Sequence, residues 1–319
     1  MGNRYAFLEK QRRDRYFVPF AKTGPKFEQI ESLRPQIEYD MSQLRISYDK
    51  WVIEQWEKQR TPKNTAIIDA AIARYPKGYC REISQGVLNG MLRPENHLGY
   101  PELKASGIPI KKVFGIHSKR YFQNALQIGH LYVDPANNTV DKTKSPIEIT
   151  HIDESPLEQI SSYDQVIPVV ESYWHLGVYP NIYFPLISFV CPVIVCAEGE
   201  ARFLTTPIGH VSTFETQKDY AMARQFIFDS AYSAKRLPQQ TLDGMCAGLT
   251  QAAEKLLKKT EDAEYFELLR ESVKPKEPEQ SKTKFEQILA ERAEGTTSWD
   301  ALLFHIGTQF GRELCEMND

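Results

Sequence analysis

The stretch YFQNALQIGHLYVDPANN, residues 121–138, has an extended character as far as Asp134 and then meets a strong turn signal in PANN. Farther along, SPIEITHID, residues 145–153, alternates apolar and polar side chains as a half-buried strand does. IPIKKVFGIH, residues 108–117, is also extended in character. Together these segments predict strands of an antiparallel sheet, with PANN as a turn between two of them.

A second extended region lies downstream. The run IYFPLISFVCPVIVCA, residues 182–197, is rich in β-branched and aromatic residues and predicts a buried strand. Gly199 then predicts a turn, and EARFLTTP, residues 200–207, predicts the hairpin partner. Because the run is short and contains two prolines, we expect no membrane span.

Helical patterns flank the predicted sheet on both sides. Upstream, helices fit residues 65–74 and 79–92, and residues 36–60 carry an apolar stripe of Ile37, Met41, Leu44, Tyr48, Trp51 and Trp56. Downstream, a helix fits residues 163–176, and the pattern is helical again from Lys218 onward. The predicted fold class is α+β and helix-rich, with a central, mainly antiparallel sheet at about residues 108–215 between N- and C-terminal helical regions.

The chain is predicted to divide into five segments. The charged, proline-bearing stretch ESVKPKEPEQSKTK, residues 271–284, is poor in apolar groups and is the best linker candidate. The segments are an aromatic and basic arm with a helix at 1–62, an α+β core at 63–216, a helical region packed on the core at 217–272, a linker at 273–284 and C-terminal helices at 285–319.

The net charge and the cysteine content restrict the partners and the compartment. The 319 residues carry a net charge of −3, which gives no reason to expect nucleic acid or an acidic membrane as a partner. The five cysteines form an odd set without a CxxC pair, which suits a reducing compartment. Since the N-terminus also lacks the apolar region of a signal peptide, we expect a cytoplasmic location.

Residues 1–20 mix basic and aromatic side chains. Such a segment would suit a nucleic-acid arm or a docking surface. The more usual arrangement packs the aromatic rings on the body of the protein and leaves the charges in water, because long cationic stems cover apolar surface well. We therefore expect these rings to be packed.

Cys80 is the candidate nucleophile of the chain. It follows Gly78 at the predicted start of a helix, where the helix dipole and unpaired backbone N–H groups favour a thiolate. Cys80 also lies three residues before Ile83, on the apolar stripe of the same helix, and cysteine often packs as a small buried residue. The sequence leaves both interpretations open.

The pattern Gly-Tyr-Cys-Arg-Glu-Ile-Ser, followed by a histidine and an acid on later strands, resembles the transglutaminase-like branch of papain-type cysteine enzymes. In that family a histidine on a strand after the cysteine helix pairs with the thiol, and an acid on the next strand orients it. One assignment is His117 with Asp134, which places the hairpin turn near Ala125. The other is His130 with Glu148, or with Asp153 farther along, and PANN as the turn.

Patterns typical of metal and cofactor sites are weaker than the pattern around Cys80. Glu148 and His151 have the spacing of a helical metal pair, but they lie in a predicted strand, where residues three apart point to opposite faces. Glu171 and His175 are four apart on a predicted helix, as in an ordinary surface hydrogen bond. No glycine-rich phosphate loop, dinucleotide fingerprint or serine elbow is present. We expect neither a metal nor an organic cofactor.

Two functions follow from these patterns. The first is a cysteine-dependent hydrolase or acyltransferase that acts on a small molecule or peptide, with Cys80 as nucleophile, His130 or His117 as base, and Glu148 or Asp134 as the orienting acid. The second is a non-catalytic adaptor or assembly subunit that binds protein partners through helical surfaces, with Trp51, Trp56 or Trp299 as anchors.

Overall fold

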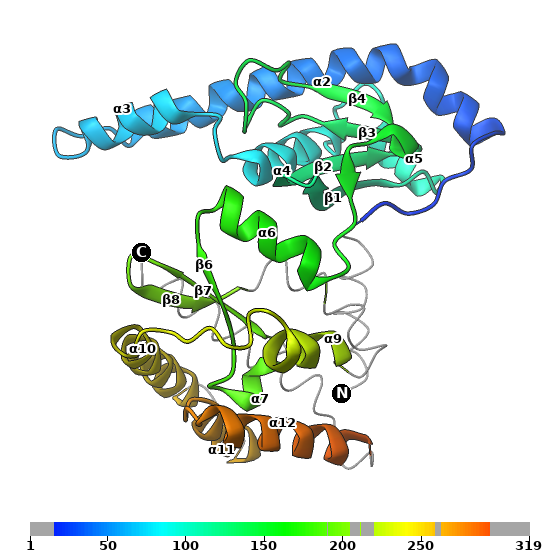
Figure 1. Ribbon diagram of the computed structural model, residues 1–319. Helices are drawn as coiled ribbons and strands as arrows, with labels where there is room; N and C mark the ends of the chain where they lie inside the picture. The colour runs from blue at the N-terminus through cyan, green and yellow to red at the C-terminus, as the bar shows by residue number, and fades with distance from the viewer. Residues whose placement is uncertain (1–15, 190, 205–210, 212–219, 259–262, 294–319) are drawn as a thin grey trace. The chain divides into compact units, whose positions relative to one another are not determined.

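The computed structural model describes residues 16–189, 191–204, 211, 220–258 and 263–293 (Figure 1). The chain forms two compact units, one of residues 13–159 and one that begins at Ile160. Each unit combines helices with its own antiparallel sheet. The predicted α+β class is therefore confirmed, and the strands of the predicted central region belong to two sheets.

A five-stranded antiparallel sheet forms the centre of the first unit, with the strand order β4-β3-β2-β1-β5. Its strands are β1 (Ile110–His117), β2 (Tyr121–Ile128), β3 (Leu131–Asp134), β4 (Glu148–His151) and β5 (Leu157–Glu158). The stretch of residues 121–138 thus supplies β2 and β3, as its extended character predicts.

The turns of this sheet differ in part from those expected. PANN begins the connection between β3 and β4, as predicted, and Asp134 lies opposite Glu148. Ala125, however, lies in the middle of β2, and the turn before it falls at Ser118 and Lys119, both with positive φ. The turn from β2 to β3 is made by Gly129 (φ 60°) and His130. A turn near Ala125 is therefore wrong.

Helices α2 (Pro25–Lys58), α3 (Thr65–Arg74), α4 (Cys80–Met91) and α5 (Tyr100–Ala105) complete the first unit (Figure 1). The predicted helices at 65–74 and 79–92 are confirmed. The helix predicted at 36–60 is longer, because it begins at Pro25 and continues through Pro35.

The core of the first unit lies between α2, α4 and one face of the sheet. Two glycines allow α4 to approach α2 closely. A Cβ on Gly86 would lie 2.0 Å from the Tyr48 ring, and a Cβ on Gly90 would lie 2.8 Å from the Leu44 side chain. The fully buried members of the core include Ile30, Ile37, Met41, Ile83, Met91, Tyr100, Leu126, Ile128, Leu131 and Val133.

The described end of the N-terminal arm packs on the first unit. The Tyr16 hydroxyl donates to the backbone carbonyl of Leu157 at 2.9 Å, and the Phe17 ring meets Tyr132 edge-on. The backbone of Val18 exchanges two hydrogen bonds with the side-chain amide of Gln127. The expectation that the aromatic rings pack on the body is confirmed for this described part.

The second unit carries α6 (Tyr163–Tyr173) and a three-stranded sheet in the order β6-β7-β8, formed by Gly177–Pro180, Val193–Ala197 and Glu200–Phe203. The predicted hairpin about Gly199 is present. The run of residues 182–197 is only partly a strand, because Pro185 begins the short helix α7 (Pro185–Ser188) and Pro192 lacks the N–H that a ladder needs.

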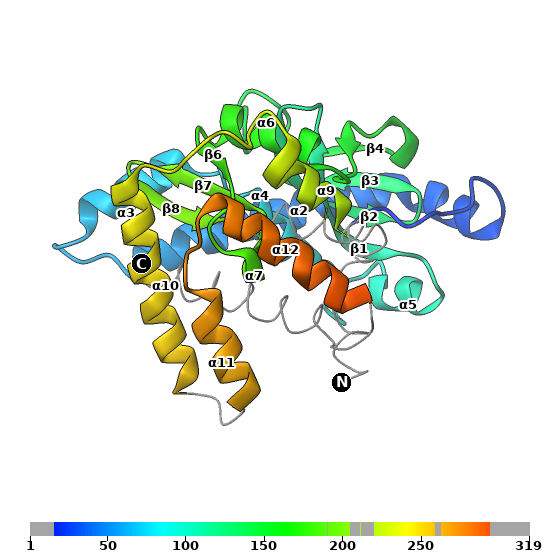
Figure 2. The ribbon, with the colours of Figure 1, turned by 60° about the horizontal axis from the view of Figure 1, so that its bottom comes forward.

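The remaining helices of the second unit are α9 (Ala221–Arg224), followed by a π-helical turn, α10 (Gln239–Leu257), α11 (Ala263–Ser272) and α12 (Pro278–Ala293). Helices α10 and α11 lie side by side (Figure 2). Phe189 stacks on Phe285 of α12 at 4.1 Å. The stretch proposed as a linker, residues 273–284, belongs to α12 from Pro278 on. Within the described ranges, no helix has the length and apolar character needed to cross a membrane.

Candidate functional site

Cys80 is the first residue of α4, which packs on β1 and β2. The side-chain amide of Asn124 on β2 donates to the Cys80 sulfur over 3.7 Å. The Ser84 hydroxyl, one turn along α4, donates to the backbone carbonyl of Asn124 at 2.8 Å. The nearest polar partner of the thiol is therefore an amide of the adjacent strand.

The thiol of Cys80 is disfavoured as an anion. Burial raises its pKa above the usual value, and the hydrogen bonds from the Asn124 backbone and side chain offset only part of this effect. The position at the start of a helix favours a thiolate in principle. In this site desolvation is the larger contribution.

His117 ends β1 and does not contact the thiol by a hydrogen bond. Its ring stacks on Tyr121 with 4.7 Å between centroids, and neither ring nitrogen has a hydrogen-bond partner in the part of the chain that the structure describes. Burial, with a smaller effect of Lys144, lowers its pKa to about 4. His117 is therefore a neutral imidazole at neutral pH.

Asp134 ends β3 and is fully buried. Its carboxylate accepts hydrogen bonds from the Gln123 amide at 2.6 Å, the Ala136 backbone at 2.8 Å and the Tyr132 hydroxyl at 3.2 Å. Burial nevertheless raises its pKa to about 6. The register of β2 and β3 places Asp134 beside Ala125, on the sheet face opposite to Asn124, since successive residues of a strand alternate faces.

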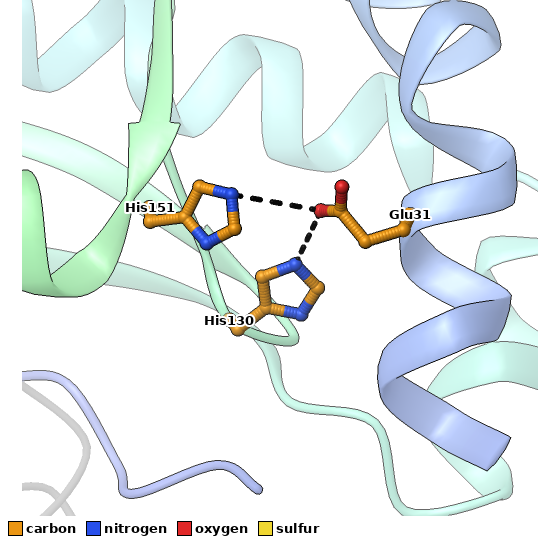
Figure 3. Close-up of side chains that lie close together, drawn as sticks. All are labelled: Glu31, His130 and His151. Atoms are coloured by element: carbon orange, nitrogen blue, oxygen red, sulfur yellow. Dashed lines mark hydrogen bonds and ion pairs between the residues drawn. The ribbon is translucent and has the colours of Figure 1, made fainter. Parts of the chain in front are cut away.

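His130 lies in the turn from β2 to β3 and contacts Glu31 of α2 (Figure 3). Its Nε2 lies 2.6 Å from Oε1 of Glu31, and its ring stacks on Phe27 with 4.1 Å between centroids. The hydrogen bond from His130 lowers the pKa of Glu31. His130 is 6% exposed, so its ring is held in place by the side chains around it.

His151 ends β4 and reaches the same carboxylate (Figure 3). Its Nε2 lies 3.8 Å from Oε1 of Glu31, and its ring centroid lies 5.1 Å from that of His130. Nη1 of Arg34 lies 3.3 Å from Nε2 of His151. Ligand atoms of Glu31, His130 and His151 all lie within 4.8 Å of one another, so these residues could hold a metal ion.

The predicted catalytic residues are distributed over different places in the first unit. The Cys80 thiol accepts a hydrogen bond from Asn124, and the His130 ring contacts the Glu31 carboxylate. The Asp134 carboxylate accepts hydrogen bonds from Gln123, Ala136 and Tyr132. Glu148 is half-buried opposite Asp134. Sequence reasoning noticed His151 but paired it with Glu148, and it missed Glu31, which has no distinguishing local pattern among the other acidic residues of α2.

The arrangement around Cys80 matches only part of the order that the resemblance implies. A cysteine begins a helix and a polar side chain of the packed strand faces it, but the acid of the next strand, Asp134, points to the opposite face of the sheet. The side chain that faces the thiol is an amide where the resemblance implies an imidazole. Comparison of the chain with protein-family models, curated proteins and solved structures found no match.

Proposed function

We propose that residues 13–159 form a protein-binding module that docks a partner on the outer face of α2. The proposal is carried by an apolar row on this face. Tyr39 and Ile46 are 64% and 60% exposed, and the half-buried Ile53 follows at the same seven-residue interval. Residues seven apart on an α-helix lie within about 20° of one direction. The three side chains therefore share one face.

The opposite face of α2 already supplies the core. Ile37, Met41 and Val52 are buried there, so the fold does not need Tyr39 or Ile46 for packing. Large apolar side chains that stay in water are candidates for burial by a partner. Trp51, one of the predicted anchors, is 53% exposed, but it lies on another side of this helix, beside the Tyr48 ring.

A helix is the partner that fits this row. Side chains that repeat every seven residues meet a second helix along a continuous seam. The exposed residues Gln43, Lys50 and Glu57 each follow a member of the row by four positions and would form a polar rim. The expected partner is therefore a protein with an amphipathic helix.

The surroundings of Cys80 also support a binding role over a catalytic one. A cysteine nucleophile needs a neighbouring base or a lowered pKa. The Asn124 amide is no base at neutral pH, and burial raises the pKa of the thiol.

The test is site-specific crosslinking of the full chain in the cells that produce it, with a photoreactive side chain at Lys50. The test variant carries both Tyr39→Ser and Ile46→Ser. The matched control carries Gln43→Ser alone, on the same face of the helix. We expect the crosslinked product to fall at least about tenfold in the double variant, because each lost anchor costs more than about 1 kcal/mol of binding. The control should keep it.

Both substitutions are at exposed positions, so the unfolding temperature should change little. A crosslinked product that the double variant leaves unchanged would contradict the proposal.

A second candidate is the cysteine-dependent hydrolase or acyltransferase. It is favoured by the position of Cys80 at the start of α4 with an amide donor at the sulfur, where an oxyanion or thiolate would be stabilised. The substrate would be a small molecule or peptide carbonyl. This candidate needs a base. His130 is engaged with Glu31, and His117 lies on the sheet face opposite to Asn124, stacked on Tyr121.

A cytoplasmic location is part of the proposal. Four described cysteines, Cys80, Cys191, Cys196 and Cys246, are free thiols, which is typical of a reducing compartment. Fractionation of cells should recover the chain with cytoplasmic markers, and recovery with secreted or membrane markers would contradict this location.

A further inference from the structure

We propose that Glu31, His130 and His151 bind one divalent transition-metal ion, with Zn²⁺ as the expected ion. This inference is independent of the docking surface on α2, because it concerns the half-buried Glu31 near the start of the same helix and two histidines of the sheet.

The donor set selects the class of ion. Two imidazole nitrogens and one carboxylate oxygen suit Zn²⁺ and neighbouring transition metals, whereas Mg²⁺ and Ca²⁺ prefer sites made of oxygen alone. Three protein ligands leave at least one coordination position for water or another small ligand.

The distances between the donor atoms are close to those of a metal centre. Oε1 of Glu31 lies 2.6 Å from Nε2 of His130 and 3.8 Å from Nε2 of His151. Two ligands bound at about 2.0–2.1 Å in a tetrahedral site lie roughly 3.3–3.5 Å apart. The observed distances lie on either side of this value, and donor atoms of the three residues all lie within 4.8 Å of one another, so side-chain rotations are needed to bring them to one ion.

The backbone places both histidines before any ion binds. Leu131 pairs with His151 across β3 and β4, and the Ile152 backbone N–H donates to the His130 carbonyl at 2.9 Å. Phe27 packs against the face of the His130 ring. Because the positions are held by the sheet and by α2, binding requires little ordering of the chain.

Arg34 competes with the ion. Its Nη1 lies 3.3 Å from Nε2 of His151, the atom whose lone pair a metal ion would need. The positive charge of the guanidinium also repels the metal cation. Arg34 also bonds the Ile149 carbonyl and the Glu38 carboxylate, so it can leave His151 and stay anchored. Arg34 is therefore expected to weaken metal binding without preventing it.

A second feature also limits the affinity. Nδ1 of His130 is buried and has no hydrogen-bond partner among the described residues. A metal-bound imidazole normally donates its other N–H to an acceptor, and loss of such a partner weakens binding by about 10–100-fold. We therefore expect micromolar rather than nanomolar affinity.

The experiment is a titration of the metal-free full chain with Zn²⁺ by calorimetry and with Co²⁺ by visible absorption. We expect one ion per chain, with Co²⁺ bands typical of nitrogen and oxygen ligands and without a thiolate charge-transfer band. Glu31→Gln and His151→Gln should weaken binding at least about tenfold, since each removes a ligand. Arg34→Gln should strengthen it at least about tenfold, because it removes the competing charge.

His97→Gln is the matched control, because His97 is an exposed histidine of the same unit, and it should leave the affinity unchanged. Circular dichroism of each metal-free variant checks folding, and His151→Gln is preferred to a change at the buried His130 for this reason. Absence of saturable binding, or equal binding by wild type and His151→Gln, would overturn the proposal. So would binding of Mg²⁺ as tightly as Zn²⁺.

Discussion

The side-chain amide of Asn124 lies 3.7 Å from the sulfur of Cys80, and the Ser84 hydroxyl holds the Asn124 backbone from the next turn of α4. The thiol is thus presented to a neutral donor on the packed strand. A donor of this kind stabilises a negative sulfur weakly, whereas a positively charged imidazole at the same place would stabilise it strongly.

Replacement of this amide by an imidazole should activate the thiol. In the wild type, the raised pKa predicts slow alkylation of Cys80 by iodoacetamide at pH 7, with a rate that rises with pH as the thiolate fraction grows. Asn124→His should increase the rate at pH 7 at least about tenfold, and Asn124→Gln, the control, should not. Mass spectrometry of the labelled peptides measures each thiol separately. Preferential labelling of wild-type Cys80 below pH 7 would instead favour the cysteine-enzyme candidate.

The buried carboxyl of Asp134 should make the stability depend on pH. Because burial raises its pKa to about 6, the folded state binds this proton more tightly than the unfolded chain does. The resulting stabilisation is present below the unfolded pKa of about 3.9 and is lost as the pH rises to about 6, a change of roughly 3 kcal/mol. Asp134→Asn removes this dependence.

Urea unfolding between pH 4 and pH 7.5 measures the effect as a difference between variant and wild type. The free energy of unfolding of Asp134→Asn, relative to wild type, should rise with pH across this interval. A difference that stays constant with pH would show that the Asp134 carboxyl has an ordinary pKa.

His117 should change the pH dependence of stability in the direction opposite to Asp134. Burial lowers its pKa to about 4, so the folded state resists protonation of the ring. Its stabilising contribution is present above about pH 6.5 and is lost as the pH falls toward 4, again by roughly 3 kcal/mol. His117→Phe keeps a ring against Tyr121 and should therefore be more stable than wild type at pH 5.

The measurement is the unfolding temperature at pH 5 and pH 8, with His97→Phe at an exposed position as the control for loss of a histidine. A gain in stability that is equal at both values of pH would argue that removal of the unpartnered nitrogens, and not protonation, is the cause.

The contact between α2 and α4 should tolerate no added methyl group at Gly86. A Cβ there would lie 2.0 Å from the Tyr48 ring, so Gly86→Ala should destabilise the chain by about 1–3 kcal/mol through overpacking. Gly244→Ala in α10 is the matched control, because a Cβ there meets nothing within 4 Å and alanine is the better helix former. Thermal unfolding of both variants compares them, and similar behaviour of the two would contradict the packing described.

The sequence by itself determined the elements whose signals are local. The helix at 65–74, the helix that begins at Cys80 and the strands on either side of PANN all follow from residue spacing and turn chemistry over a few positions. Errors occurred where the fold overrides a local signal. Helix α2 continues through Pro35, and the turn before β2 places Ser118 and Lys119 at positive φ, which neither residue type favours.

Only the tertiary structure decided which side chains meet. Asn124 lies 44 positions from Cys80, and Glu31 lies 99 positions from His130. Both contacts depend on the register of β2 and on how α2 and α4 pack against the sheet. These are set by many small packing contacts spread over the whole unit, so no short stretch of residues contains the information.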